Sequence, residues 1–313
     1  MRLSVVIPTF NRAALLGRAL GRLIAACEWS ARPCELIIVD NNSTDETAVV
    51  AARFGNRVRY VFEPRQGLSH ARNAGIAAAS GDRAGDSVIA FTDDDVEVTT
   101  EWISVLAREF DANRGAVCVG GRVLPRWSEP PPPWLSPEHW APLGLQDHGE
   151  GRQVFDRDRA LCLIGANVAF RASVFEQVGL FSTDVQRVRD SIGSTEDHEL
   201  LTRLYAAGHR AIYVPDLVVW AEVPSQRLTR RYHRRWHRGH GRFHAKMHLP
   251  EMERSRGRIL GVPAHLIRSA AADAGSWLSS AVAGDASAAF AREARLWFFS
   301  GFVRERCAWL PRR

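Results

Sequence analysis

Short apolar runs alternate with longer segments of helical periodicity through the first hundred residues, and few folds accommodate this alternation. Residues 3–7, 35–39, 57–62 and 87–92 have the composition of buried strands. Strands that alternate with helices at this pace pair in parallel, and the helices cover both faces of the sheet. The sequence therefore predicts an open, largely parallel α/β sheet.

Capping residues and periodicity predict where the other elements begin and end. Asn11 is expected to cap the first helix, and Ser43 with Glu46 to form a capping box for a helix that ends near Phe54. Further helices are expected at 69–80, closed by Gly81, and at 199–207, and further strands at 161–168 and 212–220. A long irregular insertion is expected around Pro130 to Pro133, with Trp127, Trp134 and Trp140.

Polar residues follow three of the predicted strands, at residues 8–11, 40–42 and 93–95. In open α/β sheets, ligands bind in the crevice beyond the carboxyl ends of the strands. No G-x-G-x-x-G sequence follows the first strand, which disfavours a dinucleotide-binding oxidoreductase. The three strand ends therefore predict a binding site of another kind.

The segment FTDDDVE carries four carboxylates within five residues, directly after an apolar strand. Carboxylates this close raise one another's pKa unless a cation neutralises them. Mg²⁺ or Mn²⁺ suits such oxygen ligands and leaves room for substrate phosphates. A solvated acidic turn is the alternative, and the neighbouring polar strand ends favour the cation.

Two further side chains are candidates for the same crevice. Asp40 could accept hydrogen bonds from a base or a ribose, or could cap the next helix. Arg72, in the segment HARNAG, could bring a cation to the ligand or form a surface ion pair. The residues alone leave both alternatives open.

Six segments occur in an order and spacing that resemble the family 2 glycosyltransferases with the GT-A fold, over residues 3–240. They are VVIPTFNR, IIVDNNSTDET, GLSHARNAG, FTDDDV, GANVAFRASVFEQVGLF and STEDHELLTRLYAAG. The resemblance implies metal-dependent, inverting transfer of a sugar from a nucleoside-diphosphate sugar to an acceptor hydroxyl. It also implies a role in cell-envelope glycan or glycolipid synthesis, with a lipid-linked molecule as one expected acceptor.

The resemblance also implies site residues. The nucleotide would contact Pro8, Phe10, Asp40, Arg72, Asp93 and Asp94, and the metal would be held by Asp95 and Asp93. The sugar and acceptor pocket would be lined by Gly165, Ala166 and Asn167, and the diphosphate would contact Arg235 and Trp236. The catalytic pair would be Glu196 and Asp197, with Asp197 as the base.

The implied reaction explains these residue types. A diphosphate leaving group needs a metal and arginines to stabilise its developing charge. The acceptor hydroxyl needs a carboxylate that takes its proton, and Asp197 is expected at the start of a helix for this role. Capping of that helix is the alternative role for Asp197.

Two positions depart from the family pattern. Tyr232 stands where processive synthases usually carry Gln, and no apolar stretch is long enough to cross a bilayer, so a processive polymer synthase is disfavoured. Ala221 or Glu222 stands where many relatives carry a His after a strand, so a metal or phosphate contact is not expected at that position.

The charge divides the chain into an expected GT-A domain at 1–225 and a basic, helical appendage at 226–313. The appendage has 18 Lys and Arg against 6 Asp and Glu, and residues 1–225 have 23 against 29. Its arginines could clamp a diphosphate, contact an anionic membrane surface or form a solvated helix. Nucleic acid is disfavoured because no recognised binding motif accompanies them. Helices with apolar faces are expected around 267–281 and 290–302.

Composition and cysteine content indicate the class of protein and its cellular compartment. The chain has 46% hydrophobic and 24% charged residues, which excludes a disordered protein, and its five cysteines include no C-x-x-C pair. We expect reduced structural thiols and a cytoplasmic protein, peripheral at the inner face of the membrane if the appendage binds lipid. The alternative functions are a nucleotidyltransferase of similar fold and a non-catalytic basic adaptor.

Overall fold

A computed structural model describes residues 1–79, 86–188 and 191–308. The chain forms two compact units, each described here by itself. The first comprises residues 1–126, 144–189 and 196–222, and the second comprises 127–143, 190–195 and 223–313. The division into functional domains at 225 stays a prediction.

A nine-stranded sheet forms the centre of the first unit, in the order β3-β2-β1-β4-β8-β6-β9-β5, with β7 paired to β9. The parallel half predicted from the sequence consists of β1 (Arg2–Thr9), β2 (Cys34–Asp40), β3 (Arg59–Phe62) and β4 (Ser87–Thr92). The sheet continues through β8 (Asn167–Arg171), β6 (Cys118–Trp127), β9 (Ala211–Val223), β5 (Val96–Val98) and β7 (Gln153–Phe155). β8 pairs antiparallel with β4 and β6, and β9 pairs antiparallel with β5 and β7.

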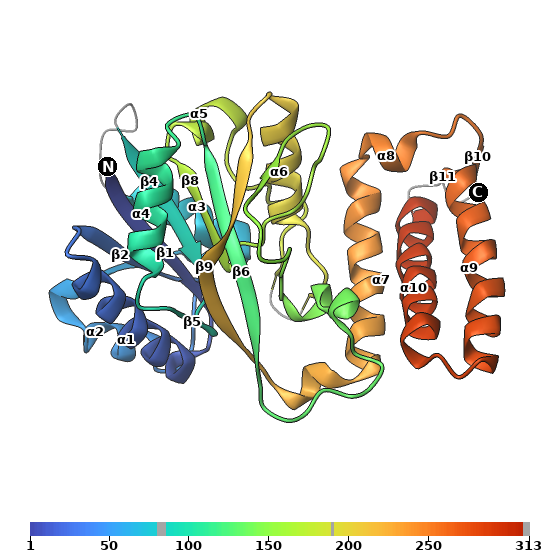
Figure 1. Cartoon of the computed structure of the whole chain (residues 1–313), viewed down its shortest axis with the longest axis horizontal. Helices are drawn as coiled ribbons and strands as arrows, with labels where there is room; N and C mark the ends of the chain where they lie inside the picture. Colours follow the sequence, from blue (N-terminus) through green and yellow to red (C-terminus); the bar gives the residue numbers. More distant parts are fainter. Residues whose placement is uncertain (80–85, 189–190, 309–313) are drawn as a thin grey trace. The chain divides into compact units, whose positions relative to one another are not determined.

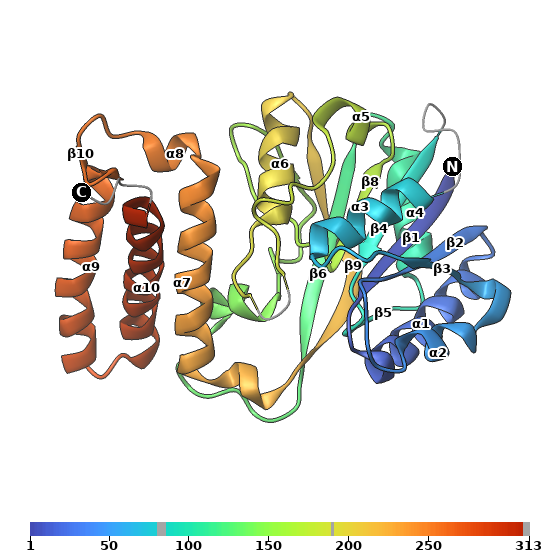
Figure 2. The same ribbon diagram turned by 180° about the vertical axis from the view of Figure 1, so that it is seen from behind.

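Helices cover both faces of this sheet, as predicted. Figure 1 shows α1 (Ala13–Ser30), α2 (Thr47–Ala52) and α4 (Trp102–Ala112) on one face. Figure 2 shows α3 (Leu68–Ala78), α5 (Val174–Val178) and α6 (Glu196–Ala206) on the other. A short 3-10 turn, η1 (Gly55–Arg57), precedes β3.

An apolar core fixes the elements that carry the polar strand ends. Phe91, on β4, packs edge-on against Phe170, Phe175 and Phe181, and all four rings are buried. On the same face α3 approaches β1 closely, because a Cβ on Gly75 would lie 2.3 Å from a methyl carbon of Val6. This close packing positions the polar end of α3 next to the ends of β1 and β4.

Both predicted helix caps are wrong, because long-range contacts replace them. Asn11 has φ 52° and accepts a hydrogen bond from the Thr44 backbone N–H, so it does not cap α1. The Asp45 carboxylate accepts from the backbone N–H groups of Ala13 and Thr47, at the starts of α1 and α2. One carboxylate therefore replaces both the Asn11 cap and the expected capping box.

Other predicted boundaries shift because the backbone turns. Residues 161–166 are not a strand, since the chain turns at Ile164, whose carbonyl accepts from the Asn167 N–H, and β8 begins only there. The strand expected at 57–62 begins at Arg59, after η1. The helix expected at 69–80 ends at Ala78, and its predicted end at Ser80 and Gly81 lies outside the described residues. The helix expected at 199–207 is α6, which begins at Glu196.

One pair of cysteines contradicts the expectation of reduced thiols. Cys27, near the end of α1, and Cys34, at the start of β2, form a disulfide with their Cα atoms 6.3 Å apart. The short connection from α1 to β2 brings them together, which their sequence spacing did not indicate. Cys118, Cys162 and Cys307 are free thiols.

The second unit contains the helices predicted for the C-terminal region. Its elements are η4 (Ser225–Leu228), α7 (Arg230–Met247), α8 (Pro250–Glu253), β10 (Arg258–Ile259), β11 (Val262–Pro263), α9 (Ala264–Val282) and α10 (Ala286–Ala308). Figures 1 and 2 show α10 beside both α7 and α9. No helix in the described part of the chain is long and apolar enough to cross a membrane.

The proline-rich insertion belongs to this second unit. Its only regular structure in the described residues is two 3-10 turns, η2 (Pro137–His139) and η3 (Ala141–Leu143), as its prolines predict. The ring of Trp134 lies 4.5 Å from that of Phe290 and 5.0 Å from that of His233, measured between centroids. The insertion is therefore part of the core of the helical unit.

Candidate active site

The three polar strand ends predicted from the sequence meet at one edge of the sheet. β1 pairs with β2 on one side, where Thr9 aligns with Asp40, and with β4 on the other, where Val6 aligns with Phe91. The residues that follow each strand therefore extend beyond the same edge. The crevice expected for a ligand is formed there.

The acidic loop after β4 is held by two side chains, one at the end of β1 and one directly before α1. The Thr9 hydroxyl donates to Asp94 Oδ2 over 2.8 Å. Arg12 Nη1 lies 2.8 Å from Asp94 Oδ1 and 2.9 Å from Asp95 Oδ2, so one guanidinium bridges two neighbouring carboxylates. Arg12 was not among the predicted site residues, although it falls within the segment VVIPTFNR.

The carboxylates of this loop are hard to keep ionised. Burial, with the nearby charge of Asp95, raises the pKa of Asp94 to about 6, against the opposing effect of Arg12. Burial also raises the pKa of Asp93, which Asp95 raises further and Arg72 lowers. A further cation would therefore be bound favourably at this loop.

A buried arginine connects the acidic loop to the predicted catalytic pair. Arg72, on α3, is 1% exposed, and its Nη1 lies 2.6 Å from Asp197 Oδ1 and 3.7 Å from Glu196 Oε1. Its Nη2 lies 3.9 Å from Asp93 Oδ1. Burial acts to lower the pKa of Arg72, but the charges of Asp197, Glu196 and Asp93 raise it above its ordinary value. The guanidinium therefore stays charged between the two groups of carboxylates.

Gly165 contacts both members of the ion pair between Arg72 and Asp197. Its backbone N–H donates to Asp197 Oδ2 over 2.9 Å. A Cβ at this position would lie 2.0 Å from Arg72 Nη2 and 2.8 Å from Asp197 Oδ1. The position therefore requires glycine, and it fixes the second oxygen of Asp197.

Asn167 is completely buried, and its side chain joins three segments. It accepts from Trp102 Nε1 and donates to the carbonyls of Arg122 and Leu217, each over 2.8 Å. Its neighbour Ala166 is also buried. The predicted contact of these two residues with a sugar or acceptor stays a prediction.

Asp40 ends β2 with both carboxylate oxygens hydrogen-bonded. Oδ1 accepts from the Ser43 backbone N–H over 2.8 Å, and Oδ2 accepts from the Tyr60 hydroxyl over 2.6 Å. Burial and this bond raise the pKa of Tyr60, which the sequence analysis did not single out. Pro8 is buried and Phe10 is half-buried at the same edge. Their contacts with a nucleobase stay predictions.

Arg235 and Trp236 lie on α7, in the second unit. The indole of Trp236 stacks on the imidazole of His240, with 4.4 Å between centroids and 22° between planes. The predicted contact of Arg235 and Trp236 with a diphosphate stays a prediction.

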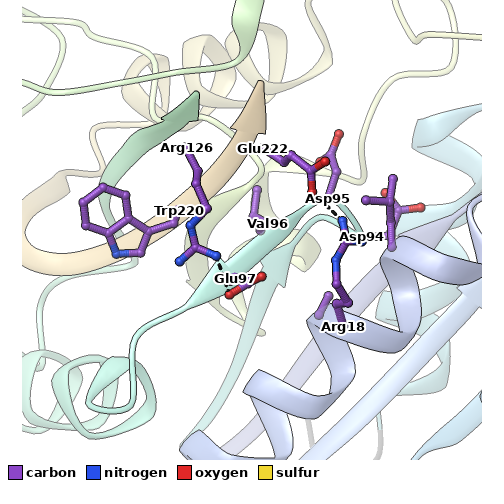
Figure 3. A pocket seen from close by; sticks show the side chains of 10 residues that line it. Arg18, Asp94, Asp95, Val96, Glu97, Arg126, Trp220 and Glu222 are labelled. Carbon is purple, nitrogen blue, oxygen red and sulfur yellow. Dashed lines mark hydrogen bonds and ion pairs between the residues drawn. The ribbon is translucent and has the colours of Figure 1, made fainter. Parts of the chain in front are cut away.

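A small, partly open pocket adjoins the acidic loop on the side of α1 (Figure 3). Glu97 binds Arg126 over 2.7 Å, and Glu222 forms an ion pair with Arg18. Glu222, one of the two residues expected where many relatives carry histidine, therefore faces a cation. The pocket is lined by Leu15, Arg18, Ala19, Asp94, Asp95, Val96, Glu97, Arg126, Trp220 and Glu222.

The donor atoms present fit a cation that phosphate oxygens help to hold. Among the described residues, no group of three or more His, Cys, Asp or Glu side chains could hold a metal ion. Mg²⁺ at phosphate-transfer sites is commonly bound through one or two carboxylates plus substrate phosphates. Asp93 and Asp95 supply carboxylates of this kind, and Asp93 is a third exposed.

The family model for glycosyl transferase family 2 matches residues 4–179. The chain belongs to this family. The glucosyl-dolichyl phosphate glucuronosyltransferase of Haloferax volcanii is 28% identical over 219 residues, which are 68% of this chain and 66% of that protein. The GalNAc(5)-diNAcBac-PP-undecaprenol beta-1,3-glucosyltransferase of Campylobacter jejuni is 32% identical over 39% of this chain and 38% of its own length. The chain thus spans about two thirds or less of these relatives.

Solved structures confirm the expected GT-A fold. The mannosyltransferase PcManGT from Pyrobaculum calidifontis, in complex with GDP-Man and Mn²⁺, has a TM-score of 0.61 and 20% identity, over 98% of this chain and 87% of that chain. S. aureus TarS 1-349 in complex with UDP-GlcNAc has a TM-score of 0.55 and 15% identity, over 94% and 90%. At these identities the likeness concerns the fold alone.

Proposed function

We propose that this member of the family transfers a sugar from a nucleoside-diphosphate donor to an acceptor hydroxyl, with inversion at the anomeric carbon. The main support for this proposal is the contact of Arg72 with both Asp197 and Asp93. It couples a carboxylate suited to proton abstraction with carboxylates suited to a metal-bound diphosphate. Both lie where α/β sheets bind ligands.

Asp197 is the proposed general base. Its Oδ1 is bound to Arg72 and its Oδ2 to the Gly165 N–H, so the carboxylate is fixed in orientation. As the acceptor oxygen attacks the anomeric carbon, Asp197 takes its proton and the bond from that carbon to the diphosphate breaks. A positioned base typically contributes about 10²- to 10⁴-fold to the rate. Direct displacement of this kind inverts the anomeric centre.

The loop of Asp93, Asp94 and Asp95 is the proposed diphosphate side of the site. Mn²⁺ or Mg²⁺ held by Asp95 and Asp93 would neutralise the charge that develops on the leaving diphosphate. Thr9, at the end of β1, and Arg12, directly before α1, fix the loop, and Arg72 adds a permanent positive charge beside it. Contacts within the protein hold these groups in place, and electrostatic stabilisation of a transition state requires such preorganised charges.

We further propose a lipid-linked acceptor and a peripheral position on the cytoplasmic face of the cell membrane, in cell-envelope glycan or glycolipid synthesis. The names of two relatives include a dolichyl phosphate and an undecaprenol diphosphate, which supports this acceptor class. The net charge of +12 over residues 226–313 supports contact with anionic lipid.

A thermal-shift screen of UDP-, GDP- and dTDP-sugars, with Mn²⁺, with Mg²⁺ and with chelator, tests the proposed donor class. A ligand bound by the native state raises Tm, so we expect one donor to do so only with metal. The selected donor is then incubated with a lipid-linked acceptor, and the anomeric configuration of the product is determined by NMR. Products formed only from a nucleoside triphosphate and a sugar phosphate would instead establish a nucleotidyltransferase. Donor binding without turnover on any acceptor would support the alternative function, a non-catalytic adaptor.

A further inference from the structure

The hairpin of β10 and β11 has an apolar, exposed tip. Ile259 pairs with Val262, and the two residues between them, Leu260 and Gly261, have φ of 50° and 76°. Two-residue loops with positive φ at both positions favour Asn, Asp or Gly, because a side chain with a Cβ strains the backbone there. Leucine is therefore a costly residue at this position.

Packing does not account for these apolar side chains. Ile259 is 60% exposed and Leu260 is 64% exposed, whereas Val262 and Pro263 of the same hairpin are buried. Val262 packs in a small core with Ala245 and Phe302. The hairpin is thus anchored by β11, and its tip is left in solvent. Strained residues that folding does not need are often functional.

The surroundings of the tip are positively charged. Residues 254–272 contain four arginines and no acidic residue, and Arg254, Arg256 and Arg258 all precede the tip and are exposed. The nearest preceding acidic residue, Glu253, is bound by Arg258 and Arg306. An exposed apolar tip next to exposed arginines, of which Arg258 is paired with Glu253, complements a surface with anionic head groups above an apolar layer.

Apolar side chains are also exposed on α9, which follows the hairpin. No residue of this helix is buried, and it exposes the apolar side chains of Trp277, Leu278 and Val282, the last to 82%. Its one acidic residue, Asp273, lies against α10, where it pairs with Arg292 and Arg295. Trp is enriched where proteins meet the membrane interface.

We propose that the tip residues Ile259 and Leu260, together with the exposed apolar side chains of α9, dock on an anionic bilayer. The arginines before the tip bind lipid phosphates, and the two apolar side chains enter the boundary between head groups and acyl chains. This assignment deepens the proposed function and rests on it, because it names the surface that would bring the enzyme to a lipid-linked acceptor.

Sedimentation of the full chain with vesicles tests this surface. The vesicles are phosphatidylcholine alone, or three parts phosphatidylcholine to one part phosphatidylglycerol, in low and high salt. We expect binding to the anionic vesicles only, weakened by salt. Leu260→Asn should lower the apparent affinity by about tenfold, because a buried Leu side chain contributes on that scale. Its Tm should stay equal or rise, since Asn suits a positive φ.

Val49→Asn is the matched control, because Val49 is 55% exposed on α2 of the first unit. It should leave vesicle affinity unchanged. Equal affinity of Leu260→Asn and the unsubstituted protein would overturn the proposal. So would a concentration-dependent dimer, seen without vesicles and lost in Leu260→Asn, because a second copy would then occupy the surface.

The vesicle experiment contains neither donor nor acceptor, so its result is independent of the proposed chemistry. If the protein does not bind vesicles but still transfers sugar to a soluble acceptor analogue, only the proposal of the docking surface is wrong. If vesicles bind but no donor is turned over, the surface stands and the proposed reaction fails.

Discussion

Arg72 and Asp197 form a 2.6 Å ion pair that joins α3 to α6. Arg72 is almost entirely buried, so solvent screens this pair little, and loss of either partner leaves a charge in a poor environment. Glu196 and Asp93 lie 3.7 Å and 3.9 Å from the same guanidinium. A change at Asp197 therefore leaves Arg72 with other carboxylates, which makes the following substitution informative.

Asp197→Asn should lower sugar transfer by about 10²- to 10⁴-fold, the usual contribution of a general base. Donor affinity should remain near that of the unsubstituted protein, because the carboxylates of the acidic loop are unchanged. The measurements are turnover with a verified acceptor and calorimetric titration of the donor. Unchanged turnover in a variant with unchanged Tm would show that another group takes the proton.

Asp95→Ala should remove the part of donor affinity that depends on a divalent cation. The carboxylate is expected to bind the diphosphate through the ion, so its loss should make affinity with Mn²⁺ equal to affinity with chelator. Calorimetry on both proteins checks this, with circular dichroism as the control for folding. Metal-independent affinity in the unsubstituted protein would contradict the assignment of the loop.

Gly165→Ala should impair transfer more than it impairs folding. The new methyl group would lie 2.0 Å from Arg72 Nη2, so the guanidinium or the backbone must move and carry Asp197 with it. A misplacement of about 1 Å can cost about 10²-fold in rate. Gly115→Ala is the matched control, because no atom lies within 4 Å of its Cβ, and its rate should be unchanged. Equal rates in the two variants would show that this contact does not position Asp197.

The parallel half of the sheet and the meeting of its polar ends followed from the sequence. Strand-like runs that alternate with helical segments determine strand pairing, and the pairing brings Asp40 and the loop at 93–95 to one edge. Side-chain partners could not be predicted in this way. Arg12 binds Asp94 and Asp95, which lie 82 and 83 positions further along the chain. Tyr60 reaches Asp40 only because β3 pairs beside β2. Such contacts depend on rotamers and register, which periodicity does not determine.

The same limit explains the wrong caps and the missed disulfide. Asn11 has a side chain suited to capping, but its backbone has a positive φ and its oxygen accepts from Thr44. The association of Cys27 with Cys34 depends on the connection between α1 and β2, whereas an odd cysteine count suggested free thiols. Local preference was overridden by tertiary contacts in both cases.

Cys34→Ser should lower the free energy of unfolding without affecting transfer. A disulfide that closes so short a loop contributes about 2 kcal/mol through the entropy of the unfolded chain. Cys34 begins β2 and Asp40 ends it, so the bond lies at the end of the strand away from the site. Urea unfolding with and without reductant, and alkylation followed by mass spectrometry, check the bond. Alkylation of both cysteines without reductant would contradict it.

Acid should destabilise the second unit, because α7 holds the buried His233 and the half-buried His237 in their neutral form. Burial, with a smaller effect from His139, lowers the pKa of His233 to about 4, and burial lowers that of His237 to about 4. In the unfolded chain both pKa values are about 6.5. Below that pH the unfolded state binds protons that the folded state does not. The stabilising contribution is therefore complete above about pH 6.5 and is lost progressively as the pH falls towards 4.

Hydrogen exchange of α7 amides between about pH 7 and pH 5, corrected for intrinsic exchange rates, measures this loss directly. We expect the free energy of opening to fall with pH, and to fall less steeply in His233→Phe, because that ring no longer titrates. Phenylalanine suits the site, since His233 packs edge-on against Trp134 and against Phe290. Amides of β1 and β4 in the first unit serve as the internal reference. An α7 stability that does not change over this range would show that His233 and His237 do not control the acid response.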